Sequence, residues 1–549
     1  MDRREALLLS AAGAAAALGR PAHASVSIKT GARQEPGYVS TPPLSAVAKT
    51  QYGKVRGFLD GGVYTFKGVP YGQDTGGENR WLPAKPPAPW KDEYPALTYG
   101  ANCRQYLHGW TQIEQTFLQD WTDGWQSEDM LKLNIWTPDL TGSRAVMFYI
   151  HGGGFEFGSA YELPSQDGAQ LARYHDVVSV TVNHRLNGLG FLDVSEVGGS
   201  AYEDSVNAGM SDLVVALRWV QENIANFGGD PDRVMIYGQS GGGSKVTCLM
   251  GMPSAQGLFH RASVQSGGGG DMPSGEEGKE FTRQLLKELG IAPHDITALQ
   301  KVDWPALDAA ANRVPVKFNP FKGLSFFPGP PATRHFWTPT LDGRVITMKS
   351  FEDAAPEISK NVPMLIGSVS EEGNSMRSNP TEAEWHASLA KVMGDTKASA
   401  LIAAMKKAHP EKAIRTLSYG VAGVIFRGNV VRMAKMKYDL HAAPVYQYFF
   451  SWQTPILDGV PGAWHTSELQ FCFDNTVRCK QGTGNTPEAQ TLAKKMATAW
   501  SNFAKTGNPN QPGLVWTPSD PERNQTMVWD NQCRMADDPE GEVRKILQS

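Results

Sequence analysis

A serine in a glycine-rich pentapeptide is the residue of this sequence best suited to covalent chemistry. Ser240 lies at the centre of a G-x-S-x-G sequence at 238–242, which directly follows a short apolar run ending at Tyr237 and precedes a helical pattern. A nucleophilic serine must sit on a tight turn from strand to helix, and glycines two residues before and after it remove side chains that would clash there. The N-terminus of the helix also favours the negative charge that develops during attack. We therefore predict that Ser240 is the nucleophile of an acyl-transfer reaction.

A run of three glycines offers the second requirement of acyl transfer, which is a set of hydrogen-bond donors for the oxyanion. Gly152, Gly153 and Gly154 follow an apolar run that ends at Ile150. Glycines let backbone N–H groups turn toward a ligand without obstruction by side chains. Together with the N–H group of Gly241, those of Gly152 and Gly153 predict an oxyanion hole with three donors.

Short buried strands must position both segments. Apolar or β-branched runs separated by helical patterns predict strands at 133–136, 145–150, 177–182, 233–237, 364–367 and 445–450. Apolar residues at helical spacing predict helices at 212–227 and 488–504. This alternation predicts an α/β fold, with a large, mostly parallel central sheet and helices on both faces. Residues 47–70 predict a small antiparallel β meander ahead of that sheet.

Composition limits the classes of function. Of 549 residues, 41% are hydrophobic and 20% are charged, as in an ordinary globular protein. The formal net charge is −4 at pH 7, so the chain lacks the basic field with which nucleic-acid binders neutralise backbone phosphates, and no nucleic-acid partner is expected. No CxxC, HExxH or paired-histidine motif occurs. We therefore expect neither a metal nor another cofactor.

The N-terminal residues have the order of a bacterial signal peptide. Arg3 and Arg4 precede an apolar stretch from Ala6 to Gly19, and a small-x-small sequence follows at 22–24. Paired arginines indicate the twin-arginine route, and the stretch is too short for a stable membrane anchor. We expect residues 1–24 to be removed on export to the periplasm or the extracellular space. The alternative is an alanine-rich helix on a cytosolic protein.

The remainder is expected to form one domain. Residues 25–46 are polar, with proline and glycine, and predict an extended lead-in. Residues 47–549 contain no internal repeat and no low-complexity linker, so they predict a single domain with helical and loop insertions.

Further segments resemble the type B carboxylesterase and cholinesterase family. Besides the two glycine motifs, matches to family motifs occur in the expected order at 68–72 (GVPYG), 127–136 (SEDMLKLNIW), 182–186 (VNHRL), 227–231 (FGGDP) and 264–267 (VQSG). The resemblance implies the α/β-hydrolase fold, with insertions that form an active-site gorge. It also implies a serine esterase that acts on small-molecule esters without a cofactor.

The resemblance also implies the other two members of a catalytic triad. The family's acid lies in a [DE]-E-G turn after a strand, which is matched at 371–373 and assigns the role to Glu372. The family's histidine lies in a G-x-x-H-x-x-E-[LI] segment, which is matched at 462–469 and assigns the role to His465. His465 would take the proton of Ser240 and pass it to the leaving alcohol, while Glu372 orients the imidazole. The neighbouring Glu371 is expected to be solvated and of little consequence.

The cysteines depart from the family pattern. Met130 stands where the family has a cysteine, so Cys103, which resembles the usual partner, has lost its disulfide. Cys472 and Cys479 are close enough in sequence to close a short loop. Cys248 is expected to be a small buried hydrophobic residue.

Other departures concern specificity. On either side of Ser240, Gln239 stands where the family commonly has glutamate, and Gly241 stands where it commonly has alanine. Glu156 follows the glycine run and either disfavours anionic acyl groups or faces solvent. The loop before Met130 is expected to contribute aromatic residues to the gorge, or simply to pack them, and these are Trp110, Phe117, Trp121 and Trp125.

Two alternatives stay open at the level of sequence. An amidase, lactonase or carbamate hydrolase would use the same acyl-enzyme. A catalytically inactive binding module would keep the fold, but here all three triad positions are filled.

Overall fold

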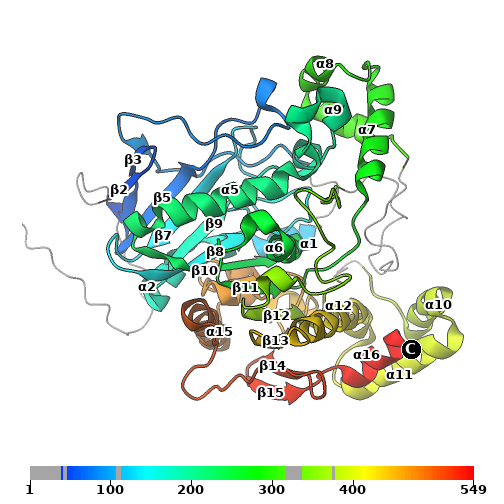
Figure 1. Cartoon of the computed structure of the whole chain (residues 1–549). Helices are drawn as coiled ribbons and strands as arrows, with labels where there is room; N and C mark the ends of the chain where they lie inside the picture. The colour runs from blue at the N-terminus through cyan, green and yellow to red at the C-terminus, as the bar shows by residue number, and fades with distance from the viewer. Residues whose placement is uncertain (1–38, 41–45, 107–112, 316–336, 374–377) are drawn as a thin grey trace, which may run out of the picture. The chain divides into compact units, whose positions relative to one another are not determined.

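A sheet of twelve strands organises the described part of the chain (Figure 1), in the order β1-β4-β5-β7-β9-β8-β10-β11-β12-β13-β14-β15. The computed structural model describes residues 39–40, 46–106, 113–315, 337–373 and 378–549. The strands are β1 (Val39–Ser40), β4 (Phe58–Asp60), β5 (Val63–Pro70), β7 (Lys132–Thr137), β8 (Arg144–Ile150), β9 (Val178–Val182), β10 (Gly229–Gln239), β11 (Arg261–Gln265), β12 (Met364–Val369), β13 (Val445–Phe450), β14 (Gln525–Trp529) and β15 (Arg534–Asp537).

The centre of the sheet is parallel and its margins are antiparallel. Parallel pairing joins β9, β8, β10, β11, β12, β13 and β14 in succession. Antiparallel pairing adds β7, β5, β4 and β1 on one side and β15 on the other. The prediction of a mostly parallel sheet is therefore confirmed, as are the six strands expected within it.

Both faces of the sheet are covered, because its central strands are apolar on both sides. In β8, Val146 and Phe148 belong to one core, whereas Met147 and Tyr149 belong to the other. Successive apolar side chains of β8 therefore point into the two cores in turn, which is typical of a parallel strand that is buried on both faces.

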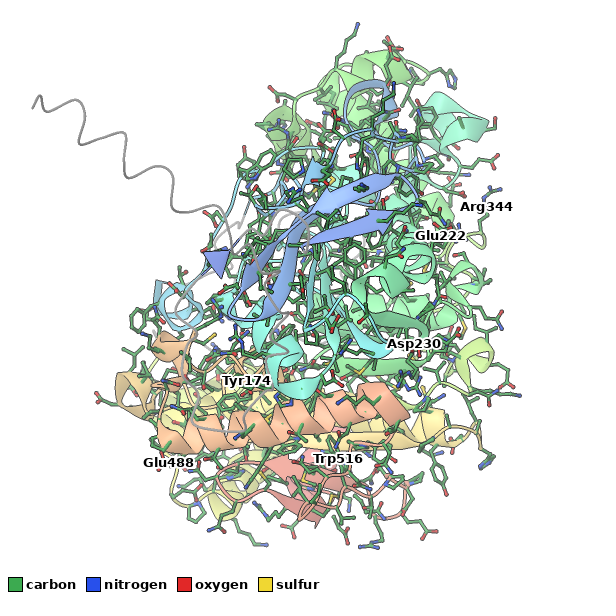
Figure 2. All side chains as sticks on the ribbon, turned by 90° about the vertical axis from the view of Figure 1, so that its left-hand side faces the viewer. Tyr174, Glu222, Asp230, Arg344, Glu488 and Trp516 are labelled. Atoms are coloured by element: carbon green, nitrogen blue, oxygen red, sulfur yellow. The ribbon has the colours of Figure 1, made fainter. Side chains whose placement is uncertain are left out.

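Different helices cover the two faces. The first core receives side chains from α5 (Ala208–Asn223), α6 (Gly241–Gly251) and α12 (Ile414–Tyr438). The second receives side chains from α2 (Ala169–His175), α13 (Leu469–Cys472) and α15 (Pro487–Thr506). Figure 2 shows this second face, with Tyr174 at the end of α2 and Glu488 at the start of α15.

The predicted helix at 488–504 corresponds to α15, and that at 212–227 corresponds to α5 followed by the 3-10 turn Ile224–Phe227.

The remaining helices include two further groups. One group shares a separate apolar core and consists of α10 (Glu382–Met393), α11 (Asp395–Ala408) and α16 (Gly541–Gln548), which contacts the first turns of α12. Figure 1 shows α10, α11 and α16 together near the C-terminus. A second group contains α7 (Gly275–Leu289), α8 (Ile296–Gln300) and α9 (Trp304–Ala311), whose apolar side chains join the first core. The shorter helices are α1 (Ile113–Gln119), α3 (Asn187–Gly190), α4 (Ser195–Gly198) and α14 (Lys480–Thr483).

The expected N-terminal meander is divided between two sheets. β2 (Val47–Thr50) and β3 (Gly53–Arg56) form a hairpin in a separate three-stranded sheet with β6 (Tyr94–Pro95). β4 and β5 instead pair with each other and join the large sheet through β7. The prediction of one small meander at 47–70 was wrong in this respect, because β5 is buried along most of its length and continues the central sheet.

The N-terminal predictions fall mostly outside the described residues. This holds for residues 1–24 and for residues 25–46 apart from Val39, Ser40 and Ala46. Val39 and Ser40 form β1 at the edge of the large sheet, where they pair with Leu59 and Asp60 of β4. Among the described helices, none combines the length and the apolar character needed to cross a membrane.

Candidate active site

Ser240 occupies a strained turn between β10 and α6, as its sequence context predicts. Its φ is 58° and its ψ is −124°, and it is the residue that immediately precedes the first helical position of α6. Positive φ is uncommon for a residue with a side chain and is found where surrounding structure imposes it. The Ser240 N–H donates to the Gln265 carbonyl on β11 at 2.8 Å. The turn is thereby held against the neighbouring strand, with the side chain half-buried.

The flanking glycines are required by close backbone contacts. A Cβ atom at Gly242 would lie 2.1 Å from the Ile150 carbonyl oxygen, and one at Gly238 would lie 2.5 Å from the Gly242 carbonyl carbon. Real Cβ atoms do not approach other atoms so closely. The G-x-S-x-G spacing therefore lets α6 begin directly against the end of β8.

Gly241 packs directly on residues 151–155, which contain the glycine run and are here named the oxyanion loop after their predicted role. A Cβ atom at Gly241 would lie 2.4 Å from the Gly154 nitrogen, so the common alanine does not fit this backbone. A Cβ atom at Gly152 would lie 3.5 Å from Ser240 Cβ, which places the loop beside the turn that carries Ser240. Within the described chain, the N–H groups of Gly152, Gly153 and Gly241 make no hydrogen bond. These three donors are thus left available beside Ser240.

His465 contacts Glu372 across the end of the sheet. Its Nδ1 and the Glu372 Oε2 form a short contact. Glu372 follows β12 and is almost completely buried, and its other oxygen accepts from the Val369 N–H at 3.0 Å. Burial alone would lower the pKa of His465, but the charge of Glu372 and its hydrogen bond outweigh that effect and raise the pKa.

The second ring nitrogen of His465 faces the turn that carries Ser240. Its Nε2 lies 3.3 Å from the side-chain nitrogen of Gln239, the residue before Ser240. Because Nδ1–H donates to the carboxylate, Nε2 carries the lone pair and accepts from the Gln239 amide. The imidazole therefore spans the distance between Glu372 and the turn that carries Ser240, with its basic nitrogen on the serine side.

Glu371 is not the solvated neighbour expected from the sequence. It is 1% exposed, and its carboxylate pairs with Lys412 Nζ at 2.7 Å. Its second oxygen accepts from the Ala463 N–H at 2.8 Å and from Gln453 Nε2 at 3.2 Å. The expectation was wrong because groups distant in sequence fold over this side of the turn. Glu371 therefore anchors the segment that leads into His465.

A second acid, Glu468, lies buried near the same histidine. Burial and the nearby charge of Glu372 raise the pKa of Glu468 to about 8. The Glu468 side chain is fully buried one turn after His465. The raised pKa favours the protonated form of Glu468, which weakens its negative charge beside Glu372 and His465.

The residues predicted to influence specificity differ in their burial. Glu156 is buried, and its Oε1 accepts from the Trp337 N–H at 3.2 Å, so it does not face solvent. Trp121 packs against the second core, with its ring 6.3 Å from that of Phe157. Phe117 and Trp125 are exposed, and Trp110 lies outside the described residues.

All five cysteines are free thiols. Cys472 and Cys479 are both buried without a disulfide between them, and Cys103 is likewise unpaired, as the replacement of its partner by Met130 implies. Cys248 is buried, in agreement with its predicted role as a small hydrophobic residue. In the described residues, no cluster of three or more His, Cys, Asp or Glu side chains could hold a metal ion.

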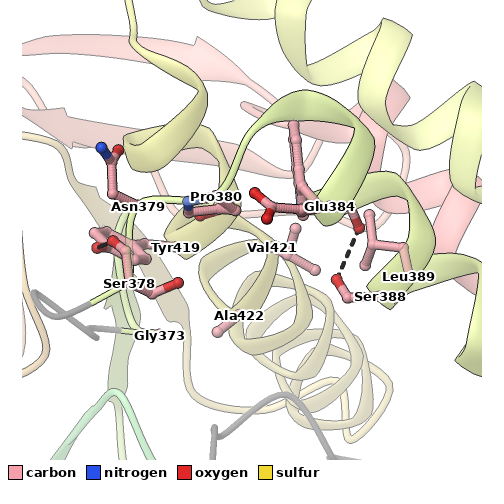
Figure 3. Close-up of a pocket in the computed structure, with 12 residues that line it drawn as sticks. Gly373, Ser378, Asn379, Pro380, Glu384, Ser388, Leu389, Tyr419, Val421 and Ala422 are labelled. Atoms are coloured by element: carbon pink, nitrogen blue, oxygen red, sulfur yellow. Dashed lines mark hydrogen bonds between the residues drawn. The ribbon is translucent and has the colours of Figure 1, made fainter.

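A cavity of about 520 Å³ lies beyond the turn that follows Glu372. Figure 3 shows the side chains of α10 and α12 that surround it, together with Gly373, Ser378, Asn379 and Pro380. Neither Ser240 nor His465 lines this cavity. It is therefore separate from the surroundings of Ser240.

Comparison with known proteins identifies relatives over almost the whole chain. Residues 44–545 match the model of the "Carboxylesterase family". The para-nitrobenzyl esterase of Bacillus subtilis (strain 168) is 31% identical over 510 residues, which cover 91% of this chain and 98% of that protein. The phenmedipham hydrolase of Pseudarthrobacter oxydans is 33% identical over 490 residues, or 86% of this chain and 92% of that protein.

Solved structures agree with this result. An esterase from anaerobic Clostridium hathewayi, described as able to hydrolyse aliphatic aromatic polyesters, superposes with a TM-score of 0.78 at 34% identity. The match covers 91% of this chain and 97% of that one. A structure of PNB esterase superposes with a TM-score of 0.73 at 31% identity, and covers 91% and 99% of the two chains. The predicted α/β-hydrolase fold is confirmed by these neighbours.

Proposed function

We propose, on the premise that this chain belongs to the carboxylesterase family and is a serine hydrolase of carboxylic esters, that it works through a Ser240-His465-Glu372 triad. The relatives described above are esterases and all three triad positions are filled in this chain, which favours an enzyme over an inactive binding module. The finer proposal concerns which residues carry out the reaction and how.

The observation that carries the proposal is the position of the His465 ring. One nitrogen contacts Glu372, and the other contacts Gln239, which is adjacent to Ser240. A general base must be oriented by one partner and must direct its lone pair at the nucleophile. The contact with Glu372 meets the first condition, and the contact with Gln239 brings Nε2 next to the turn that carries Ser240, which supports the second.

In the proposed reaction, Ser240 Oγ attacks the ester carbonyl carbon while its proton passes to His465 Nε2. The carbonyl oxygen becomes an oxyanion, to which the N–H groups of Gly152, Gly153 and Gly241 donate hydrogen bonds. Collapse of the tetrahedral intermediate expels the alcohol, which takes the proton from His465. Water then repeats the sequence on the acyl-enzyme and releases the carboxylic acid. The chain and water provide every group that this scheme uses.

The negative charge of Glu372 stabilises the imidazolium that forms in each half-reaction. Glu372 is buried, so its interaction with His465 is little screened by solvent. The same charge raises the pKa of His465, which makes it a stronger base than an isolated imidazole. Glu372 in this scheme orients and stabilises without accepting the proton.

The proposal is tested by covalent labelling of the intact enzyme with a fluorophosphonate. The reagent phosphonylates an activated serine, and fluoride leaves. We expect one adduct per chain, which peptide mapping assigns to Ser240, together with loss of hydrolysis of p-nitrophenyl esters. Labelling at a different serine, or esterase activity that survives complete labelling of Ser240, would overturn the assignment.

A further inference from the structure

Lys245 is completely buried beneath the oxyanion loop. It lies on α6, one turn after Gly241. Side chains on an α-helix tilt toward its N-terminus, so the Lys245 side chain runs back toward the loop. Its Nζ donates to the His151 carbonyl at 3.0 Å and, at a longer 3.4 Å, to the Gly152 carbonyl.

These two carbonyls belong to the peptide groups that carry the proposed oxyanion donors. The His151 carbonyl shares a planar trans peptide with the Gly152 N–H, and the Gly152 carbonyl shares one with the Gly153 N–H. In a trans peptide the C=O and N–H bonds point in opposite directions. A group that holds both carbonyls from below therefore fixes both N–H bonds toward the opposite side.

The His151 ring contributes to the same arrangement. Its Nδ1–H donates to the Gly152 carbonyl at 3.0 Å. Burial and the charge of Lys245 lower the pKa of His151 well below its ordinary value, so the ring is neutral. The rings of His151 and His184 stack with centroids 5.0 Å apart, which fixes the His151 plane.

Burying a lysine in this space is energetically unfavourable. Removing an ammonium group from water without a close counter-charge is strongly unfavourable. Glu162 is the acid that acts on Lys245 electrostatically, but its own oxygens accept from the Ser159 N–H and from Gln166. A methionine would fill the same volume without that cost.

We propose that Lys245 is a positioning residue for the oxyanion hole: it holds the peptides of Gly152 and Gly153 with their N–H groups toward the substrate oxygen. The role rests on the proposed esterase function. Burial lowers the pKa of Lys245 to about 7 against the attraction of Glu162. Both the ammonium and the amine have N–H groups, so the carbonyls are held in either state. The ammonium state also polarises the two peptides, which strengthens their N–H groups as donors.

The test compares Lys245→Met with the wild type in full-length enzyme. Hydrogen bonds to an oxyanion act in the transition state, so kcat should fall while KM stays within about twofold. Because the loop loses its orientation but keeps its N–H groups, we expect a loss of roughly 10-fold to 100-fold, below the 10²–10³ seen when a donor is deleted. An aryl trifluoromethyl ketone gives the second readout. Addition of Ser240 Oγ to the ketone carbon makes a stable oxyanion, so its inhibition constant should rise by a similar factor.

Lys437→Met is the matched control. Lys437 is also a buried lysine, and its Nζ donates to two backbone carbonyls, those of Ser359 at 2.9 Å and Lys360 at 2.7 Å. It lies at the end of α12 and contacts neither the triad residues nor the oxyanion loop. Lys437→Met should lower the melting temperature and leave kcat and the ketone affinity of the folded enzyme unchanged.

The outcomes separate the two proposals. If wild-type enzyme neither hydrolyses p-nitrophenyl esters nor reacts with a fluorophosphonate, the esterase mechanism itself is contradicted. If the wild type is active and folded Lys245→Met keeps its kcat and ketone affinity, the positioning role alone is overturned. Should Lys245→Met not fold, Lys245→Gln is measured in the same way, because its shorter side chain stops short of the carbonyls. An unchanged kcat in that variant likewise overturns the role.

Discussion

Glu372 and Glu371 are neighbours in the chain, both are buried, and their carboxylates bind different residues of the His465 segment. Glu372 contacts the His465 ring, whereas Glu371 binds the backbone N–H of Ala463, two residues before it. Glu372 thus contacts the imidazole, and Glu371 holds the backbone segment that positions the imidazole.

The two acids should therefore respond differently to substitution. Glu372→Gln should lower kcat by about 10⁴, the effect of the equivalent change in serine proteases, because the imidazole loses its orientation and its counter-charge. Steady-state kinetics on a p-nitrophenyl ester, with circular dichroism to verify the fold, measures this loss. A kcat near that of the wild type would show that the triad acid lies elsewhere.

Glu371→Gln should act mainly on stability. Lys412 is largely buried and would lose its ion-pair partner, and breaking such a pair costs roughly 3 kcal/mol or more. We expect a lower melting temperature with a smaller loss of kcat than in Glu372→Gln. A larger loss of kcat in Glu371→Gln, at unchanged melting temperature, would mean that the assignment is shifted by one residue.

The pH dependence of the reaction follows from the raised pKa of His465. The imidazole must be neutral to accept the serine proton, so kcat/KM falls as pH drops through that pKa. Because Glu372 raises the pKa, Glu372→Gln should move the acid limb of residual activity to lower pH. The free energy of unfolding depends on pH in the opposite sense. The pairing of protonated His465 with Glu372 stabilises the fold fully below the unfolded histidine pKa of about 6.5, and this contribution is lost as pH rises through the folded pKa. A pH–rate profile of both enzymes tests the shift, and a limb that stays in place would contradict it.

The close contact between α6 and β8 predicts an intolerance to side chains. Gly242→Ala would place a Cβ atom 2.1 Å from the Ile150 carbonyl oxygen, so the helix must move. We expect a destabilisation of about 1–3 kcal/mol and a clear loss of kcat, because Ser240 moves with the helix. Gly275→Ala at the first position of α7 is the control, since its nearest neighbour is the Leu341 carbonyl at 3.9 Å. Thermal unfolding and kinetics of both variants decide the matter; equal behaviour would refute the steric explanation.

How far the sequence determines the site depends on whether the relevant contacts are local. The turn at Ser240 is specified within a few residues by a strand, two glycines and a helix, so it could be predicted directly. Glu372 and His465 meet across 93 positions of sequence, and only the family resemblance singled them out. The burial of Glu371 was missed because its partner Lys412 comes from the turn between α11 and α12.

The same distinction explains the fold. The central strands are apolar on both faces, a local pattern that predicted their positions well. The division of residues 47–70 between two sheets depends instead on which strand each segment pairs with. Pairing of β5 with β7 is decided by the register of residues about 70 positions apart, which periodicity within 47–70 does not contain.

We also propose that the protein is exported with removal of residues 1–24, on the strength of Arg3, Arg4 and the small residues at 22–24. Intact-mass measurement of the protein from a bacterial periplasm should give a chain that starts at or near Ser25. Substitution of both arginines by lysine is the control and should retain the precursor in the cytoplasm if the twin-arginine route is used. A mature protein that keeps Met1 would refute the processing.

Replacement of the proposed nucleophile tests the account most directly. The measurement is kcat of Ser240→Ala on a p-nitrophenyl ester, with enzyme purified away from host esterases and verified as folded. We predict a loss of several powers of ten, toward the roughly 10⁶-fold loss that follows removal of the nucleophile in a serine protease, with only a residue from the oxyanion hole and substrate binding. Turnover close to that of the wild type would contradict the assignment of Ser240 and, with it, the proposed triad.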